Sequence, residues 1–102
     1  MRYFAVAISD LNETEQKSVL QFIEQHGLGW WYWIANFWLL IDPHDKLDVA
    51  EIRNHLMGLT TGKRCIVLDV TKEDRQWSGF SPASESEQMF NWVHTYWKPY
   101  KT

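Results

Sequence analysis

The sequence predicts an α+β fold of one small domain, and three observations predict it. Segments typical of strands and segments typical of helices follow one another along 102 residues. The composition is 45% hydrophobic with a formal charge of -3, which is typical of a folded chain rather than a disordered one. A chain of this length buries roughly 60–70% of the surface that its unfolded form exposes, which is enough for one core. We therefore expect a single domain over residues 1–102.

The first segments are predicted to be a strand and a helix. Arg2–Ser9 is a short apolar run of strand length. From Glu13 to His26, apolar residues recur at helical spacing. Asn12 with Glu15 three residues later resembles a capping box, and Gly27 suits the left-handed residue that ends a helix.

A β-hairpin is predicted next. Trp30–Ile34 and Phe37–Asp42 are rich in residues that favour strands, and only Ala35 and Asn36 separate them. Because Asn tolerates a positive φ, a tight turn at this pair is the natural interpretation. Pro43 ends the second strand.

A second helix and a fourth strand follow. We expect Asp45 to cap the helix and Gly58 to end it. Its buried stripe would consist of Val49, Ile52 and Leu56. Arg64–Val70 has an apolar centre and is predicted to be a strand, in which Cys65 would be a core thiol.

The C-terminal part is predicted to be a loop and a helix. Residues 72–82 form the extended segment. Ser84 with Glu87 is the pattern of a capping box, so we expect a helix over residues 84–97. Its apolar stripe would consist of Met89, Val93 and Trp97.

This order predicts a ferredoxin-like βαββαβ sandwich with an additional C-terminal helix. Two βα units around a central hairpin form that motif in residues 1–71. Right-handed crossovers give the strand order 4-1-3-2 and put both helices of the motif on one face of the sheet. The other face stays open, and either the C-terminal helix or a second subunit would cover it.

The composition excludes several classes of protein. A single Cys excludes an internal disulfide framework and a multi-cysteine zinc site. The apolar run from Trp30 to Ile41 is shorter than the ~20 residues that span a bilayer, and no signal peptide is recognisable, so we expect a cytoplasmic protein without membrane partners. The acidic balance argues against a broad nucleic-acid interface.

Four polar residues are predicted to meet at one rim of the sheet: Asp10, Asn36, Lys63 and Arg64. The carboxylate could hold a divalent metal, and the other three could bind an anion or nucleic acid. The alternative, which we favour, is that Asp10 and Asn12 cap the first helix and that Lys63-Arg64 is a solvated turn.

The aromatic residues favour an interface. The composition includes 7 Trp. Trp31 and Trp33 share one side of the second strand, which is an edge strand in the expected order. Aromatic side chains could also stack on bases, but that strand and its flanks carry no Lys or Arg, so packing at a core or an interface is the better interpretation.

The sequence also resembles the SinR-like proteins. These are a small bacterial group related to the CRISPR-associated adaptation and endoribonuclease ferredoxin-like family and to virulence-associated protein D. Four pieces carry the resemblance: Asp10-Leu11-Asn12, the Gly-x-x-aromatic run into Trp38-Leu39-Leu40, the segment from Ala50 to Leu56, and Trp77-Ser78-Gly79-Phe80.

The resemblance implies a homodimer. Asp10 of each subunit would face its counterpart across the two-fold axis and hold Mg²⁺ or Mn²⁺ for phosphodiester cleavage. The segment Gln76–Ser81 would cross to extend the partner's sheet, so that Trp77 and Phe80 would belong to the interface.

Three functions follow as expectations. The leading one is a small homodimeric assembly or interaction protein of a bacterium or phage, with a link to nucleic acid or defence. The second is a metal-dependent endonuclease that uses Asp10 of each subunit. The third is an accessory module that binds another protein through its aromatic edge.

Overall fold

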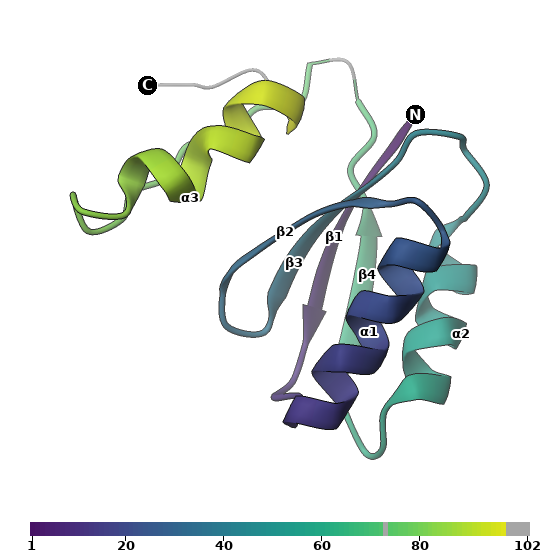
Figure 1. Ribbon diagram of the computed structural model, residues 1–102. Coiled ribbons are helices and arrows are strands. Elements are labelled where there is room, and N and C mark those ends of the chain that lie inside the picture. The colour runs from purple at the N-terminus through teal and green to yellow at the C-terminus, as the bar shows by residue number, and fades with distance from the viewer. Residues whose placement is uncertain (73, 98–102) are drawn as a thin grey trace. The chain divides into compact units, whose positions relative to one another are not determined.

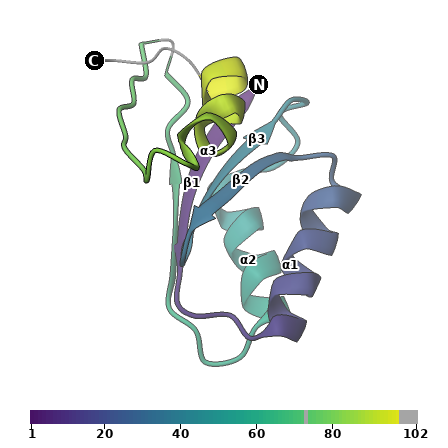
Figure 2. The ribbon, with the colours of Figure 1, turned by 60° about the vertical axis from the view of Figure 1, so that its left-hand side comes forward.

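The computed structural model describes residues 1–72 and 74–97. Residues 1–71 form one compact unit, which contains one antiparallel sheet. In chain order the elements are β1 (Arg2–Ile8), α1 (Glu13–Gln25), β2 (Gly29–Ile34), β3 (Phe37–Asp42), α2 (Val49–Leu59) and β4 (Cys65–Asp69). The strands lie in the order β2-β3-β1-β4, which is the order expected from the sequence. Figures 1 and 2 show α1 and α2 together on one face of this sheet.

The core lies between the sheet and these two helices. β1 contributes Phe4, Val6 and Ile8, which alternate along the strand and are almost fully buried. β3 contributes Trp38 and Leu40 to the same face. The helices add an apolar stripe that consists of Val19, Phe22, Ile23, Ile52 and Leu56. The residues with the other parity along each strand therefore point to the opposite face.

The predicted capping box of α1 is confirmed. The Asn12 side chain accepts from the Glu15 N–H at 2.8 Å, and the Glu15 carboxylate accepts from the Asn12 N–H at 3.1 Å. Gly27 has φ 63, so the left-handed residue after the helix is confirmed as well.

The hairpin between β2 and β3 forms as predicted, with Asn36 at φ 69. Its register is irregular, however. Trp31 lies opposite Leu39 and Ile34 lies opposite Phe37, with a shift between the two pairs. The simple alternation assumed for β2 from the sequence is therefore interrupted after Trp31.

The predicted start of α2 was wrong by three residues. Asp48, not Asp45, is the N-cap, and its carboxylate accepts from the Glu51 N–H at 2.9 Å. The reason lies in the buried Asp42, which accepts backbone N–H groups of the following loop and holds that loop in a non-helical form. Asp45 has φ 53 there, which no helix allows.

The predicted stripe and end of α2 also need correction. Ile52 and Leu56 are buried as expected, but Val49 is exposed. Gly58 lies inside the helix, which ends at Leu59.

A second compact unit begins at Lys72, and the structure describes its residues 72 and 74–97. It contains α3 (Ser86–Trp92) and a π-helical turn, η1 (Val93–Trp97). The predicted cap at Ser84 was wrong, because the Glu85 N–H bonds to the Pro82 carbonyl in a turn that delays the helix, and Glu85 then occupies the N-cap without a side-chain cap. The predicted stripe of Met89, Val93 and Trp97 is buried.

Candidate functional site

Three segments meet at one rim of the sheet: the end of β1, the β2–β3 turn and the start of β4. The Ile8 N–H donates to the Asn36 carbonyl at 3.0 Å, and the Ser9 N–H donates to the Arg64 carbonyl at 2.9 Å. The Ser9 hydroxyl oxygen in turn accepts from the Arg64 N–H at 2.8 Å. These bonds bring Asn36 and Arg64 together, as the sequence predicted.

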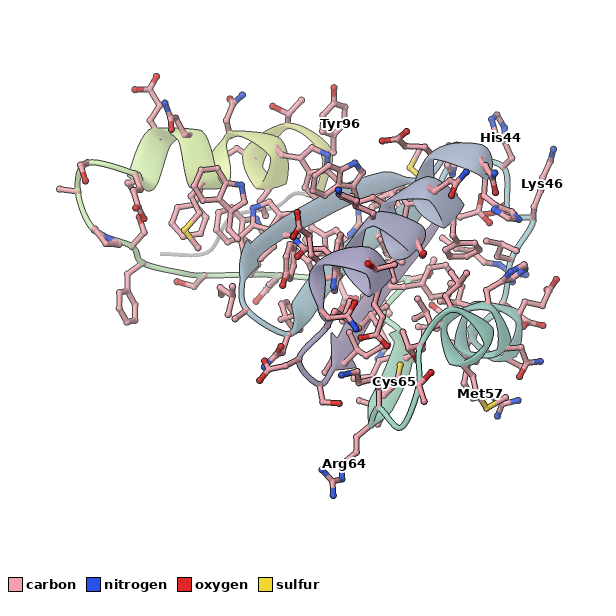
Figure 3. All side chains as sticks on the ribbon, turned by 60° about the horizontal axis from the view of Figure 1, so that its bottom comes forward. His44, Lys46, Met57, Arg64, Cys65 and Tyr96 are labelled. Atoms are coloured by element: carbon pink, nitrogen blue, oxygen red, sulfur yellow. The ribbon has the colours of Figure 1, made fainter. Side chains whose placement is uncertain are left out.

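The rim encloses a shallow hollow of about 360 Å³. Its walls are mostly apolar, and Ser9, Asn36 and Arg64 supply the polar groups. The Arg64 side chain is exposed and points away from the sheet into solvent (Figure 3). The sequence placed Ser9 only at the end of the first predicted strand and gave no signal for its role as the hydrogen-bond link between β1 and the residue before β4.

Lys63, the third predicted anion-binding residue, is engaged elsewhere. Its ammonium lies 3.4 Å from the Glu15 carboxylate, which is buried and also accepts from the Thr61 N–H at 3.0 Å. These donors, with the Asn12 N–H foremost, hold the pKa of Glu15 below its ordinary value. Lys63 therefore helps to tie the loop before β4 to the first turn of α1.

Asp10, the predicted catalytic and metal-binding residue, is exposed after the end of β1 and does not line the hollow. Within residues 1–72 and 74–97, no group of three or more His, Cys, Asp or Glu side chains could hold a metal ion. Asp10 therefore belongs to no such group among the described residues of one protomer.

The face of the sheet opposite α1 and α2 carries no charged residue in its paired positions. Strand register places eleven residues there: Tyr3, Ala5, Ala7, Gly29, Trp31, Ile34, Phe37, Leu39, Ile41, Ile66 and Leu68. We call this set the open sheet face, of which only a part is exposed: Tyr3, Trp31 and Ile41 are buried, whereas Ala7, Ile34, Ile66 and Leu68 are exposed. Its most exposed members on β4 are Ile66 and Leu68, at 57% and 49%.

The strand β4 is an unprotected edge. It has the sequence Cys-Ile-Val-Leu-Asp, without the Lys, Pro or bulge that usually keeps an edge strand from pairing. Cys65 was wrongly expected in the core, because as the first residue of an edge strand it is exposed and free. The partial burial of its thiol raises its pKa, which lowers its reactivity.

The four predicted interface aromatics differ in exposure. Trp31 is buried on β2, and Trp33 is 46% exposed on the same strand. In the second unit, Trp77 is half-buried with its ring 5.4 Å from that of Phe90. Phe80 is 95% exposed. Trp33 and Phe80 are thus the two that present large apolar surface to solvent.

Two other aromatics of β2 pack on the helix side of the sheet. The rings of Tyr32 and Trp38 stack at 4.0 Å, and Trp30 lies 5.9 Å from Trp38. Tyr32 thus packs against the core, whereas Trp30 is 39% exposed.

No protein-family model, curated protein or solved structure matches the chain. Every helix among the described residues is too short or too polar to cross a lipid bilayer.

Proposed function

We propose that this chain has a ferredoxin-like fold and functions as a homodimeric interaction protein. The observation that carries the proposal is the open sheet face, a surface without charge that includes the exposed side chains of Ile66 and Leu68. An exposed apolar patch of this kind typically marks an interface in a protein that must stay in solution.

The occupant that fits this face best is a second copy of the chain. An uncharged apolar patch is complementary to itself, so two copies can bury it around a two-fold axis. The edge strand β4 adjoins the patch and has β1 as its single strand neighbour among the described residues, so a strand of a second copy can add to its outer side. A nucleic acid fits less well, because the face carries no Lys or Arg to neutralise phosphates.

The test measures the oligomeric state of the full chain by sedimentation velocity. We expect a dimer for the wild type at micromolar concentrations. Leu68→Glu places a charge on the open sheet face beside the exposed Ile66, and we expect it to give a folded monomer.

Met57→Glu is the matched control. Met57 is 67% exposed on α2, on the helix side of the molecule (Figure 3), so the same charge there should leave the dimer intact. Circular dichroism checks that both variants fold. A wild-type monomer at micromolar concentrations, or a Leu68→Glu variant that still forms a dimer, contradicts the proposal.

A metal-dependent endonuclease is the second candidate, favoured by the exposure of Asp10 near the rim that holds Arg64. One carboxylate per protomer suffices for Mg²⁺ only when a second copy supplies another, so this activity requires the dimer. The expected result is cleavage of RNA or DNA with Mg²⁺ or Mn²⁺ that Asp10→Ala abolishes while the fold persists. Equal inactivity of the wild type and Asp10→Ala on every substrate eliminates this candidate.

A further inference from the structure

Two histidines and one phenylalanine form a cluster between α1 and α2, away from the open sheet face. The His55 ring of α2 stacks on Phe22 of α1 at 4.6 Å. The His26 ring, at the C-terminal end of α1, lies 4.7 Å from Phe22 and 5.1 Å from His55. His55 is exposed and His26 is partly buried, so solvent reaches the pair.

We propose that His26 and His55 form a binding site for a first-row divalent metal ion, with Zn²⁺ as the reference case. This inference is independent of the proposed dimer. The two rings are the protein ligands, and water molecules complete the coordination, since the described residues offer no group of three ligating side chains.

The hydrogen bonding of His26 prepares one nitrogen for a metal. Its Nδ1 lies 3.0 Å from the Phe22 carbonyl oxygen. A carbonyl oxygen only accepts, so Nδ1 carries the proton and, in the neutral ring, Nε2 keeps its lone pair. This arrangement, in which the second ring nitrogen donates to a backbone carbonyl, is the one that metal-ligating histidines commonly show.

The spacing of the rings also suits a shared ion. A Zn–N distance of about 2.0–2.1 Å and tetrahedral angles place the centroids of two ligating imidazoles about 5 Å apart. The observed separation is 5.1 Å. Because His55 is exposed, an ion from solvent can reach its ring in this position.

The position of the pair on α1 favours a cation. His26 is the C-cap of this helix, where the partial negative charge of the helix dipole gathers. The last turn of α1 has no basic residue to compensate that charge. A bound divalent ion would supply the missing positive charge and join α1 to α2.

The experiment measures Zn²⁺ binding to tag-free, chelator-treated protein by calorimetry, together with the thermal midpoint with and without ZnCl₂. We expect wild-type binding at one site per chain and a raised midpoint, because the ion binds only the folded arrangement. His55→Gln should weaken binding about tenfold or more, since it removes one of two ligands. His44→Gln is the matched control, an exposed histidine on the loop before α2 (Figure 3), and should bind as the wild type does.

His26→Gln is the second variant, and it should weaken binding to the same degree. If the loss of its bond to Phe22 unfolds the protein, His55→Gln still decides the question, because His55 makes no hydrogen bond to the backbone among the described contacts. Wild-type protein without a midpoint shift in about 1 mM Zn²⁺ overturns the proposal. So does His55→Gln protein that binds as tightly as the His44→Gln control.

Discussion

At the scale of single residues, Glu15 connects three parts of the fold. Its carboxylate closes the α1 capping box, accepts from the Thr61 N–H and pairs with Lys63. These contacts favour the ionised form and hold its pKa below the ordinary value of 4.5. The stabilisation that this carboxylate contributes is therefore fully present above pH 4.5 and is lost as the pH falls through the lowered value.

We predict that Glu15→Gln lowers the free energy of unfolding at neutral pH and that this deficit shrinks as the pH falls below 4.5. Urea unfolding between neutral pH and about pH 3 measures the difference between variant and wild type. Glu13→Gln is the control, because Glu13 is exposed on the same helical turn and pairs with the exposed Lys17 at 3.7 Å. If the loss in unfolding free energy caused by Glu15→Gln stays constant over this pH range, the ionised Glu15 carboxylate is not the source of the stabilisation.

Asp42 is a second residue whose removal should be costly. Its carboxylate is 1% exposed and accepts the backbone N–H groups of His44, Lys46 and Leu47 at 3.2, 2.7 and 2.8 Å. Asp42→Ala leaves these donors without their acceptor, and we expect a loss of about 2–4 kcal/mol in the free energy of unfolding. Denaturant unfolding measures it.

Asp69→Ala provides the comparison for this prediction. Asp69 accepts the Thr71 N–H at 2.8 Å in a similar turn, but it is exposed, so water can replace the lost acceptor. We expect its cost to stay below about 1 kcal/mol. Equal losses of unfolding free energy in Asp42→Ala and Asp69→Ala would show that burial of the carboxylate does not determine the cost of removing it.

At the scale of elements, the start of α2 can be tested directly. Asp48 makes both bonds of a capping box, whereas Asp45 lies in a left-handed conformation three residues earlier. Asp48→Ala should lower the free energy of unfolding by about 1 kcal/mol. Asp45→Ala removes an exposed ion pair with the chain's amino group, and it should cost less than half as much. A larger loss in the free energy of unfolding for Asp45→Ala than for Asp48→Ala would identify Asp45 as the N-cap.

The sequence predicted elements well where the signal was local. The α1 capping box and the Asn36 turn depend on residues three or fewer positions apart, and both formed as expected. The predicted cap of α2 failed because Asp42, a residue of β3, controls the loop through its buried carboxylate. Nothing in the sequence around Asp45 shows that this loop donates backbone hydrogen bonds to the Asp42 carboxylate of β3.

In the candidate site, too, some features could be predicted from the sequence and others depend on how side chains of separate elements pack. Strand order was enough to place Asn36 and Arg64 at one rim, because it fixes which chain ends meet. It could not show that Lys63 turns to Glu15 instead, since that choice depends on the buried position of the carboxylate. The pairing of His26 with His55 was likewise beyond the sequence, because it needs the relative placement of two helices.

At the scale of the whole molecule, the proposed dimer predicts a stability that depends on protein concentration. If two copies bury the open sheet face, unfolding must also separate them, and mass action then favours the folded dimer as the concentration rises. A tenfold increase in concentration should raise the thermal midpoint by about 2–5 °C. Differential scanning calorimetry over two decades of concentration measures the slope.

Leu68→Glu should remove the dependence of the thermal midpoint on concentration, and Met57→Glu should keep it. Of these two residues, Leu68 lies on the open sheet face and Met57 does not. At the lowest concentration the wild type should approach the midpoint of the Leu68→Glu variant, since both are then monomers. A wild-type midpoint that does not change with concentration would mean that the fold does not depend on association. The exposed side chains of Ile66 and Leu68 would then be tolerated by the isolated chain, and the argument for a second copy on this face would fail.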